Sequence, residues 1–156
     1  MPIMAVTLDR VGNVTGPPEL KIETVEGSES LTEWVRAYTP SFAVGAELIE
    51  DAIRVEAGRG DTSRIVRLTA RLEGQAVGTA LMLDAHGVAG IYVVTTAAGS
   101  RRQGIGAMLT AAALEAGRQR GLRIGTLQAS GLGEPVYARM GFEKVAEYQL
   151  FQPPAP

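Results

Sequence analysis

Hydrophobic residues recur along the chain with two different periods, so the sequence predicts a mixture of strands and helices. Alternating or continuous β-branched runs are typical of strands, whereas spacings of three and four residues are typical of helices. The predicted strands are Met4 to Leu8, Leu20 to Val25, Ile65 to Leu72, Gln75 to Leu83, Val88 to Thr96, Leu122 to Ala129 and one or two strands within Phe142 to Phe151. The predicted helices are about Ser30 to Tyr38, Ala46 to Ala57, Ala107 to Gln119 and Pro135 to Met140.

The connections between these segments decide how the strands pair. Glu73 and Gly74 form one short loop and Asp84 to Gly87 another, and loops of this kind join antiparallel strands. A helical crossover precedes Leu122 to Ala129, so this strand lies parallel to the one before it. We therefore predict an α+β (mixed α/β) fold: a central, mixed, twisted sheet of about six to seven strands, flanked by about four helices. A sheet that changes direction can splay and open a crevice at the carboxyl ends of its strands, here between the fourth and fifth strands counted from Leu20.

Three helices carry more detailed predictions. Ser30 and Glu33 fit a capping box that opens the first helix, with Trp34 and Val35 facing inward. Trp34 is either a core residue or the wall of a substrate pocket. The second helix is expected to pack through Leu48, Ile49, Ala52 and Ile53, and the third through Ile105, Met108, Leu109, Ala112 and Ala116.

The composition is that of one globular domain. The chain has 156 residues, of which 46% are hydrophobic, and this is enough for a sizeable core. We expect a single domain over residues 1–151, in which residues 1–18 form an extra strand and loop, followed by a disordered tail at residues 152–156. No segment resembles a signal peptide or approaches the ~18 apolar residues of a membrane span. The expectation is a cytoplasmic protein with no membrane partner.

Charge and side-chain chemistry exclude several kinds of site. A net charge of −2 leaves no broad basic surface for a phosphate backbone, so we expect no nucleic-acid partner. Cysteine is absent, which excludes disulfides, thiol nucleophiles and cysteine-ligated metals. The single histidine, His86, falls in a predicted turn and is expected to be a solvated turn residue. No metal site is predicted.

The segment from Arg101 to Gly106, Arg-Arg-Gln-Gly-Ile-Gly, lies between a predicted strand and a predicted helix. The first turn of a helix carries unpaired N–H groups and the positive end of the helix dipole. Glycines let a phosphate approach that backbone without a Cβ in the way. The sequence therefore predicts a binding site for a phosphate-bearing ligand.

Two common phosphate loops do not fit this segment. A P-loop needs a glycine and lysine followed by serine or threonine, and the chain has no such combination. A dinucleotide fingerprint needs a third glycine where Leu109 stands. The segment instead fits a pattern of arginine or glutamine, then glycine three residues later, then a small residue two further on. Arg101, Gly104 and Gly106 occupy these positions.

The chain resembles the GNAT superfamily of acyl-CoA N-acetyltransferases from about Leu20 to Phe151. The segments that carry the resemblance are Gly90 to Thr96, Arg101 to Gly106, Thr126 to Ser130 and Pro135 to Phe142. The loop, the parallel strand and the Tyr-x-x-x-Gly-Phe element occur in the family's order and at its spacing. The early strand also makes the chain similar to the carboxyl-terminal unit of tandem GNAT proteins.

The resemblance implies that acetyl-CoA is a co-substrate. The loop N–H groups would cradle the coenzyme A pyrophosphate, with Arg102 adding charge, and the end of the preceding strand would pair with the pantetheine arm. Ser130 stands where many relatives have an asparagine that bonds to pantetheine. Tyr137 would lie near the thioester sulfur, although it could equally be a core residue. The implied cofactor-binding residues are Val94, Thr95, Thr96, Arg101, Arg102, Gln103, Gly104, Ile105, Gly106, Ala107, Ser130 and Tyr137.

Acylation of an amine by a thioester sets the chemistry that such a site must perform. The amine must lose a proton before it attacks, because a lysine-like ammonium has a pKa of ~10.4. The tetrahedral oxyanion needs a donor, for which a backbone N–H near Thr96 is the candidate. Tyr137 is the candidate proton donor to the departing thiolate. The general base stays open among Glu47, Glu50, Asp51 and Glu134.

These expectations describe an N-acetyltransferase that moves the acetyl group of acetyl-CoA to the primary amine of a small molecule or peptide, by direct attack in a ternary complex. The alternative is a non-catalytic module that binds and senses acyl-CoA. A homodimer could cover an exposed edge strand. The region that would shape the acceptor pocket, about Ser30 to Asp61, carries Trp34, Tyr38 and Phe42, which suit a cationic or aromatic amine and equally an ordinary helical core.

Overall fold

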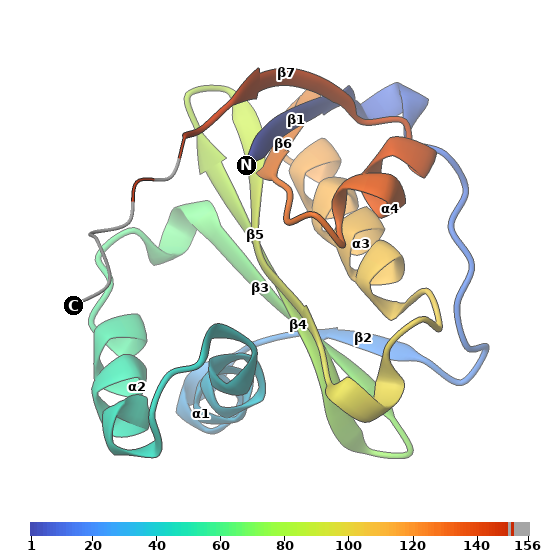
Figure 1. Cartoon of the computed structure of the whole chain (residues 1–156). Helices are drawn as coiled ribbons and strands as arrows, with labels where there is room; N and C mark the ends of the chain where they lie inside the picture. The colour runs from blue at the N-terminus through green and yellow to red at the C-terminus, as the bar shows by residue number, and fades with distance from the viewer. Residues whose placement is uncertain (150, 152–156) are drawn as a thin grey trace.

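A mixed sheet lies between two pairs of helices in the computed structural model, which describes residues 1–149 and 151 (Figure 1). The strands are β1 (Pro2–Thr7), β2 (Lys21–Thr24), β3 (Ile65–Leu72), β4 (Gln75–Ala85), β5 (Val88–Thr96), β6 (Ile124–Gln128) and β7 (Glu143–Glu147). The helices are α1 (Gly27–Tyr38), α2 (Ile49–Ala57), α3 (Ile105–Gln119) and α4 (Glu134–Arg139). In Figure 1, α1 and α2 cover one face of the sheet, and α3 and α4 cover the other.

The described strands form one seven-stranded sheet in the order β2-β3-β4-β5-β6-β1-β7. The neighbours from β2 to β5 are antiparallel, whereas β5 and β6 are parallel, as the helical crossover through α3 requires. The turns at Glu73 and His86 have positive φ angles, as do the glycines that follow them, which is the geometry of two-residue hairpins. The predicted α+β fold with a mixed sheet and flanking helices is confirmed.

The first strand of the chain is inserted between two strands that come much later. Ile3 in β1 faces Gln128 of β6 on one side and Ala146 of β7 on the other, and both pairings are antiparallel. The edges of the sheet are therefore β2 and β7. Strand β1, at the start of the chain, therefore joins the edge strand β7 to β6 and the rest of the sheet.

Two hydrophobic clusters fill the space on the two faces of the sheet. The larger cluster joins α3 to the sheet, and the smaller one lies under α1 and α2. Trp34 is fully buried in the smaller cluster, and its indole N–H donates to the carbonyl of Leu68 at 3.1 Å. Trp34 is thus a core residue rather than a pocket wall.

The predicted capping box at Ser30 is wrong. Helix α1 begins three residues earlier, at Gly27, and the Ser30 hydroxyl donates to the carbonyl of Glu26 at 2.5 Å. Ser30 therefore lies inside the helix rather than at its N-cap, and its hydroxyl bonds backward to the preceding turn. The predicted face of the second helix also needs correction, because its first turn is a 3-10 turn (Ala46–Leu48) and Leu48 is 50% exposed.

The face of α3 that packs on the sheet differs from the predicted one. Its buried residues include Ile105, Leu109 and Ala113, which repeat every four residues, whereas Met108 is only partly buried. The Met108 side chain instead contacts the loop between β1 and β2, where a Cβ on Gly16 would lie 2.9 Å from it. The loop covers a side of α3 that would otherwise face solvent.

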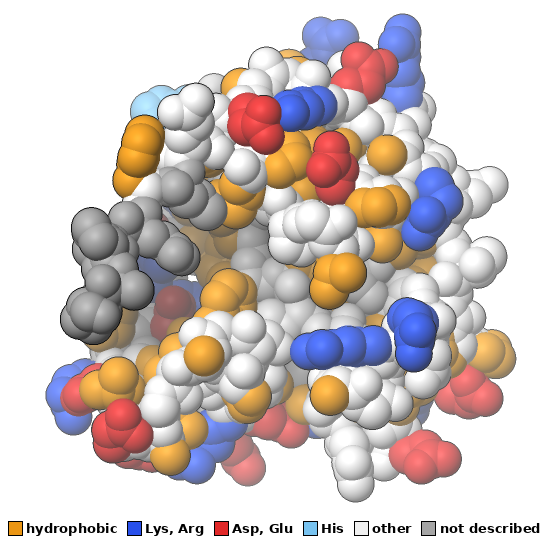
Figure 2. All heavy atoms as spheres, in the orientation of Figure 1, with side chains coloured by type: hydrophobic (Ala, Val, Ile, Leu, Met, Phe, Trp, Pro, Cys, Tyr) orange, Lys and Arg blue, Asp and Glu red, His pale blue; other side chains and the backbone are white. Residues whose placement is uncertain are grey.

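Two further observations concern the ends and the surface of the chain. The predicted disordered tail at residues 152–156 lies outside the described residues. Within the described part of the chain, no helix combines the length and hydrophobicity that a membrane span needs. Figure 2 shows acidic and basic side chains interspersed over the face in view, so this face presents no broad field of one sign.

Candidate active site

The sheet splits between β5 and β6. The two strands pair through Ala89 with Gly125, Gly90 with Thr126 and Ile91 with Leu127. Beyond these pairs, β5 continues to Thr96 beside β4, while the end of β6 pairs with β1. The splay predicted at the carboxyl ends of these two strands is confirmed, and it leaves one edge of β5 unpaired along its last residues.

A bulge in β5 lies at the mouth of this crevice. Thr79 and Leu81 of β4 face Thr95 and Tyr92 of β5, so β5 has one more residue than β4 over this stretch. Val93 has a φ of 52°, a left-handed conformation that β-branched residues rarely adopt. Bulges bend a strand and re-aim its groups beside functional sites. No local signal in the sequence predicted this bulge, because no glycine marks it.

The loop after β5 exposes a run of backbone donors. Arg102 and Gly104 both have positive φ angles, 60° and 83°, and Gly104 is the N-cap of α3. The first helical N–H with a backbone acceptor is that of Met108, which donates to Gly104 at 3.0 Å. Among the described residues, the N–H groups of residues 101–107 have no acceptor. A run of free N–H groups at a helix start, with two arginines beside it, fits an anion such as a diphosphate.

The strand end and the helix start meet at Gly106. A Cβ on this glycine would lie 3.6 Å from the Thr96 hydroxyl oxygen and 3.9 Å from a Val94 methyl. Arg101 donates from Nε to the Thr96 carbonyl at 3.3 Å, which ties the loop to the end of β5. The structure therefore brings these predicted residues together. The Thr95 side chain is the exception, because it lies on the opposite face of the sheet beside Thr79.

The loop between β1 and β2 packs directly on the loop at residues 101–106. The Thr15 carbonyl lies so close to Gly104 that a Cβ there would collide with it. A Cβ on Gly16 would lie 3.6 Å from the carbonyl oxygen of Gln103. Residues 11–20 thus brace the conformation of a loop about 90 positions later in the chain. Sequence reasoning missed this contact, because the intervening fold alone brings the two loops together.

Tyr137 in α4 faces the same helix start. Its ring makes an edge contact with Phe142, with centroids 5.7 Å apart. Burial raises the pKa of Tyr137, while the neighbouring Thr110 hydroxyl lowers it less strongly. Thr110 in turn donates to the carbonyl of Gly106 at 2.8 Å, so Tyr137 lies within reach of the first two turns of α3. Its phenol is protonated at neutral pH.

Ser130 has a structural role in the turn before α4. Its exposed side chain accepts a hydrogen bond from the N–H of Gly133 at 3.1 Å.

Two of the candidate bases are engaged by arginines, since Glu50 accepts from Arg36 and Asp51 from Arg54, each at 2.7 Å. Among the described residues, no group of three or more histidine, cysteine or acidic side chains could hold a metal.

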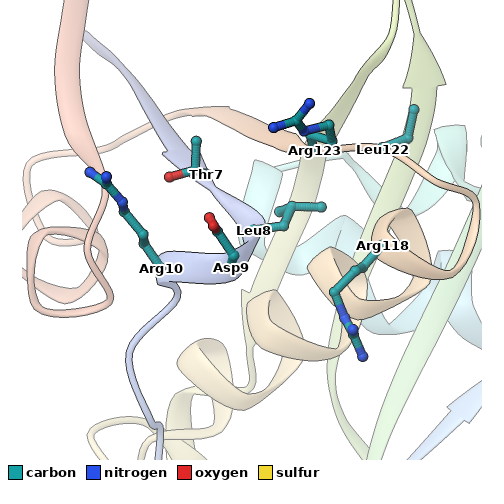
Figure 3. A pocket seen from close by; sticks show the side chains of 7 residues that line it. All are labelled: Thr7, Leu8, Asp9, Arg10, Arg118, Leu122 and Arg123. Atoms are coloured by element: carbon teal, nitrogen blue, oxygen red, sulfur yellow. The ribbon is translucent and has the colours of Figure 1, made fainter.

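A surface pocket of about 430 Å³ lies at the opposite end of the sheet from the crevice. It is lined by the end of β1 and the turn before β6, including Arg10, Arg118 and Arg123 (Figure 3). The guanidinium groups of Arg10 and Arg118 point away from each other, so they form no converging anion site. None of the site residues predicted from the sequence lines this pocket.

The sequence profile described as "Acetyltransferase (GNAT) domain" matches residues 44–152. The chain belongs to the GNAT acetyltransferase family. The match includes the bulged strand, the donor-rich loop and Tyr137, whereas β1, β2 and the bracing loop lie before it. No curated protein matches the chain significantly.

Solved structures share the fold. A GCN5-related N-acetyltransferase from Kribbella flavida is 22% identical, with a TM-score of 0.71 over 92% of this chain and 53% of its own. One from Sphaerobacter thermophilus is 22% identical, with a TM-score of 0.74 over 92% of this chain and 48% of its own. This chain spans about half the length of both. A predicted acetyltransferase from Clostridium acetobutylicum, solved with acetyl-CoA, is 17% identical, with a TM-score of 0.69 over 85% of this chain and 96% of its own.

Proposed function

We propose that this chain is an acetyl-CoA-dependent N-acetyltransferase that acetylates a primary amine by direct attack in a ternary complex. The observation that carries the proposal is the run of free N–H groups over residues 101–107 at the mouth of a splayed sheet. Family membership supports acetyl transfer, and the structure of the Clostridium acetobutylicum protein contains acetyl-CoA. A ligand with a pyrophosphate, a long arm and a reactive end matches a site with donors at one end and an open strand edge beside them.

The loop supplies the binding energy for the phosphate groups of the substrate. Backbone N–H groups and the positive end of the α3 dipole attract the pyrophosphate. The side chains of Arg101 and Arg102 are both exposed, so they are available to add charge-assisted hydrogen bonds. The open edge of β5 from Val94 to Thr96 pairs with the amides of the pantetheine arm as another strand would. Ser130 keeps its hydroxyl proton for the same arm.

Tyr137 supplies a proton in the transfer step. The amine nitrogen forms a bond to the acetyl carbon, the carbon–sulfur bond breaks, and the sulfur takes a proton. A tyrosine whose pKa is raised by burial carries that proton throughout the neutral range. A backbone N–H near Thr96 donates to the oxyanion that forms before the bond to sulfur breaks.

The attacking amine must deliver its own proton to a base or to water. Glu50 and Asp51 are held by arginines on the surface, which leaves Glu47 and Glu134 as the available carboxylates among the four candidates. The engagement of Glu50 and Asp51 by arginines also favours a second candidate function. This function is a non-catalytic module that binds acyl-CoA without turning it over. In that case the loop and crevice would hold the ligand while no amine reacts.

Release of free coenzyme A thiol from acetyl-CoA separates the two functions. The purified chain is incubated with acetyl-CoA and a panel of amines that includes polyamines, aromatic amines, aminoglycosides and peptides with free amino termini. The enzyme releases thiol only when a suitable amine is present, whereas the binding module shows a calorimetric affinity for coenzyme A without release. Absence of coenzyme A binding contradicts both.

A further inference from the structure

Two buried threonine hydroxyls hold the bulge of β5 in its unusual conformation. Thr79 is fully buried and Thr95 is 6% exposed. The Thr79 hydroxyl lies 2.8 Å from the carbonyl oxygen of Val93 and 2.8 Å from the hydroxyl oxygen of Thr95. The carbonyl can only accept, so Thr79 gives its single proton to Val93 and Thr95 gives its proton to Thr79.

The direction of these bonds matters because Val93 is strained. A β-branched residue with a φ of 52° persists only where its surroundings impose that geometry. The chain Thr95 to Thr79 to the Val93 carbonyl fixes the peptide group after Val93 in place. This peptide group begins the stretch of β5 whose other edge lies open to the crevice.

We propose that Thr79 and Thr95 are positioning residues, whose hydroxyls aim the backbone of residues 93–96 at the thioester from the opposite face of the sheet. The inference rests on the proposed acetyl transfer. The two side chains face the layer of α1, while Val94 and Thr96 face α3 and the loop. Neither hydroxyl needs to touch the substrate, because both act through the strand between them and the crevice.

Thr69 provides a matched control in the same row of the sheet. It lies directly opposite Thr79 on β3 and is 3% exposed. Its hydroxyl takes no part in the two bonds at the bulge, which join only Thr79, Thr95 and the Val93 carbonyl. A change of Thr69 to Val therefore has the same burial and shape as a change of Thr79 to Val, without loss of the bond to the bulge.

The test compares Thr79→Val, Thr79→Ser, Thr95→Val and Thr69→Val by steady-state kinetics with acetyl-CoA and a responsive amine. Small misplacements of reacting groups have large kinetic effects, so we expect Thr79→Val to lower kcat by ~10-fold or more. The KM for acetyl-CoA changes little, because the pyrophosphate loop is untouched. Thr79→Ser restores most of the rate, and Thr69→Val leaves it unchanged. Equal losses in Thr79→Val and Thr69→Val would show a general packing effect and overturn the proposal.

A second variant links the hydroxyls to the strain itself. Glycine adopts positive φ without strain, so Val93→Gly makes the bulge less dependent on Thr79. In that background, Thr79→Val costs a smaller factor in kcat than it does alone, which a double-mutant cycle measures. Equal costs in the two backgrounds overturn the inference.

A readout without turnover separates this inference from the proposed function. If the wild-type chain releases no thiol with any amine, the proposed function fails. Crystal structures of the wild type and of Thr79→Val then decide the positioning role from the φ of Val93. A value that leaves the left-handed region in the variant supports the role of Thr79, and an unchanged value overturns it.

Discussion

Substitution of Gly104 by Ala tests most sharply the proposed binding of phosphate by the loop at residues 101–106. Gly104 is the N-cap of α3 and has a φ of 83°. A Cβ at this position collides with the Thr15 carbonyl and lies 3.4 Å from the Cα of Gly16. Either the loop or the bracing segment must therefore move to accept alanine, and both border the free N–H groups.

The size of the effect follows from the backbone conformation. A left-handed residue other than glycine costs about 1–2 kcal/mol, which corresponds to a change of about 5–30-fold in an equilibrium constant. The collision with Thr15 adds to this minimum. If the loop relaxes in the free protein, substrate must restore its shape, so the cost appears as weaker coenzyme A binding. If the loop keeps its shape, the cost appears instead as a lower melting temperature.

Calorimetric titration with coenzyme A, paired with thermal unfolding, measures both quantities. Gly99→Ala is the control, because Gly99 lies in the same connection, has no neighbour within 4 Å of its Cβ position, and has no left-handed φ. We expect Gly104→Ala to weaken binding while Gly99→Ala does not. If Gly104→Ala binds coenzyme A as the wild type does and melts at a lower temperature, the cost lies in folding alone. Wild-type affinity and stability in Gly104→Ala would refute the reasoning.

Three further predictions follow from the site and its supports. Tyr137→Phe lowers turnover by ~10-fold or more because the thiolate loses its proton donor, while coenzyme A affinity is retained; steady-state kinetics at wild-type rates would remove Tyr137 from the mechanism. Glu56 and Arg67 form an ion pair with side chains only 13% and 10% exposed. Glu56→Ala leaves the charge of Arg67 buried without a partner, so it lowers the free energy of unfolding, measured with denaturant, by about 3–5 kcal/mol. Glu56→Gln lowers it less, and equal stability of the wild type and both variants would contradict this prediction. Arg59 lowers the pKa of Asp61 to about 2, below the ~3.9 of an unfolded chain. The contact between Arg59 and Asp61 therefore stabilises the fold fully above a pH of ~3.9, and this stabilisation is lost as the pH falls towards 2. A carboxyl titration by NMR that gives Asp61 an ordinary pKa would contradict the last prediction.

Local patterns predicted the elements whose folding depends on local signals. Strands β3 and β4 could be predicted from the residues of each run and from the two-residue hairpin signal at Glu73 and Gly74. The splay followed from topology, because the crossover through α3 makes β5 and β6 parallel. The loop at residues 101–106 was recognisable because glycines and arginines stand at a predicted helix start.

Features that depend on distant residues escaped prediction. Strand β1 lies between β6 and β7 because it pairs with residues more than 100 positions later in the sequence. The residues of a short strand do not by themselves indicate which distant strands they pair with. The bulge at Val93 rests on hydroxyls from two strands. The capping box at Ser30 failed for a different reason, because the same hydroxyl can bond backward within a helix as readily as it can cap one.

Transfer of a labelled acetyl group tests the central claim most directly. Acetyl-CoA that carries an isotope in its acetyl group is incubated with the chain and the amine panel, and mass spectrometry follows the label. The account predicts that the label appears as an N-acetyl group on at least one amine and that Tyr137→Phe slows its appearance. Label that remains in acetyl-CoA, or appears only as free acetate, would contradict the claim that this crevice transfers an acetyl group to an amine.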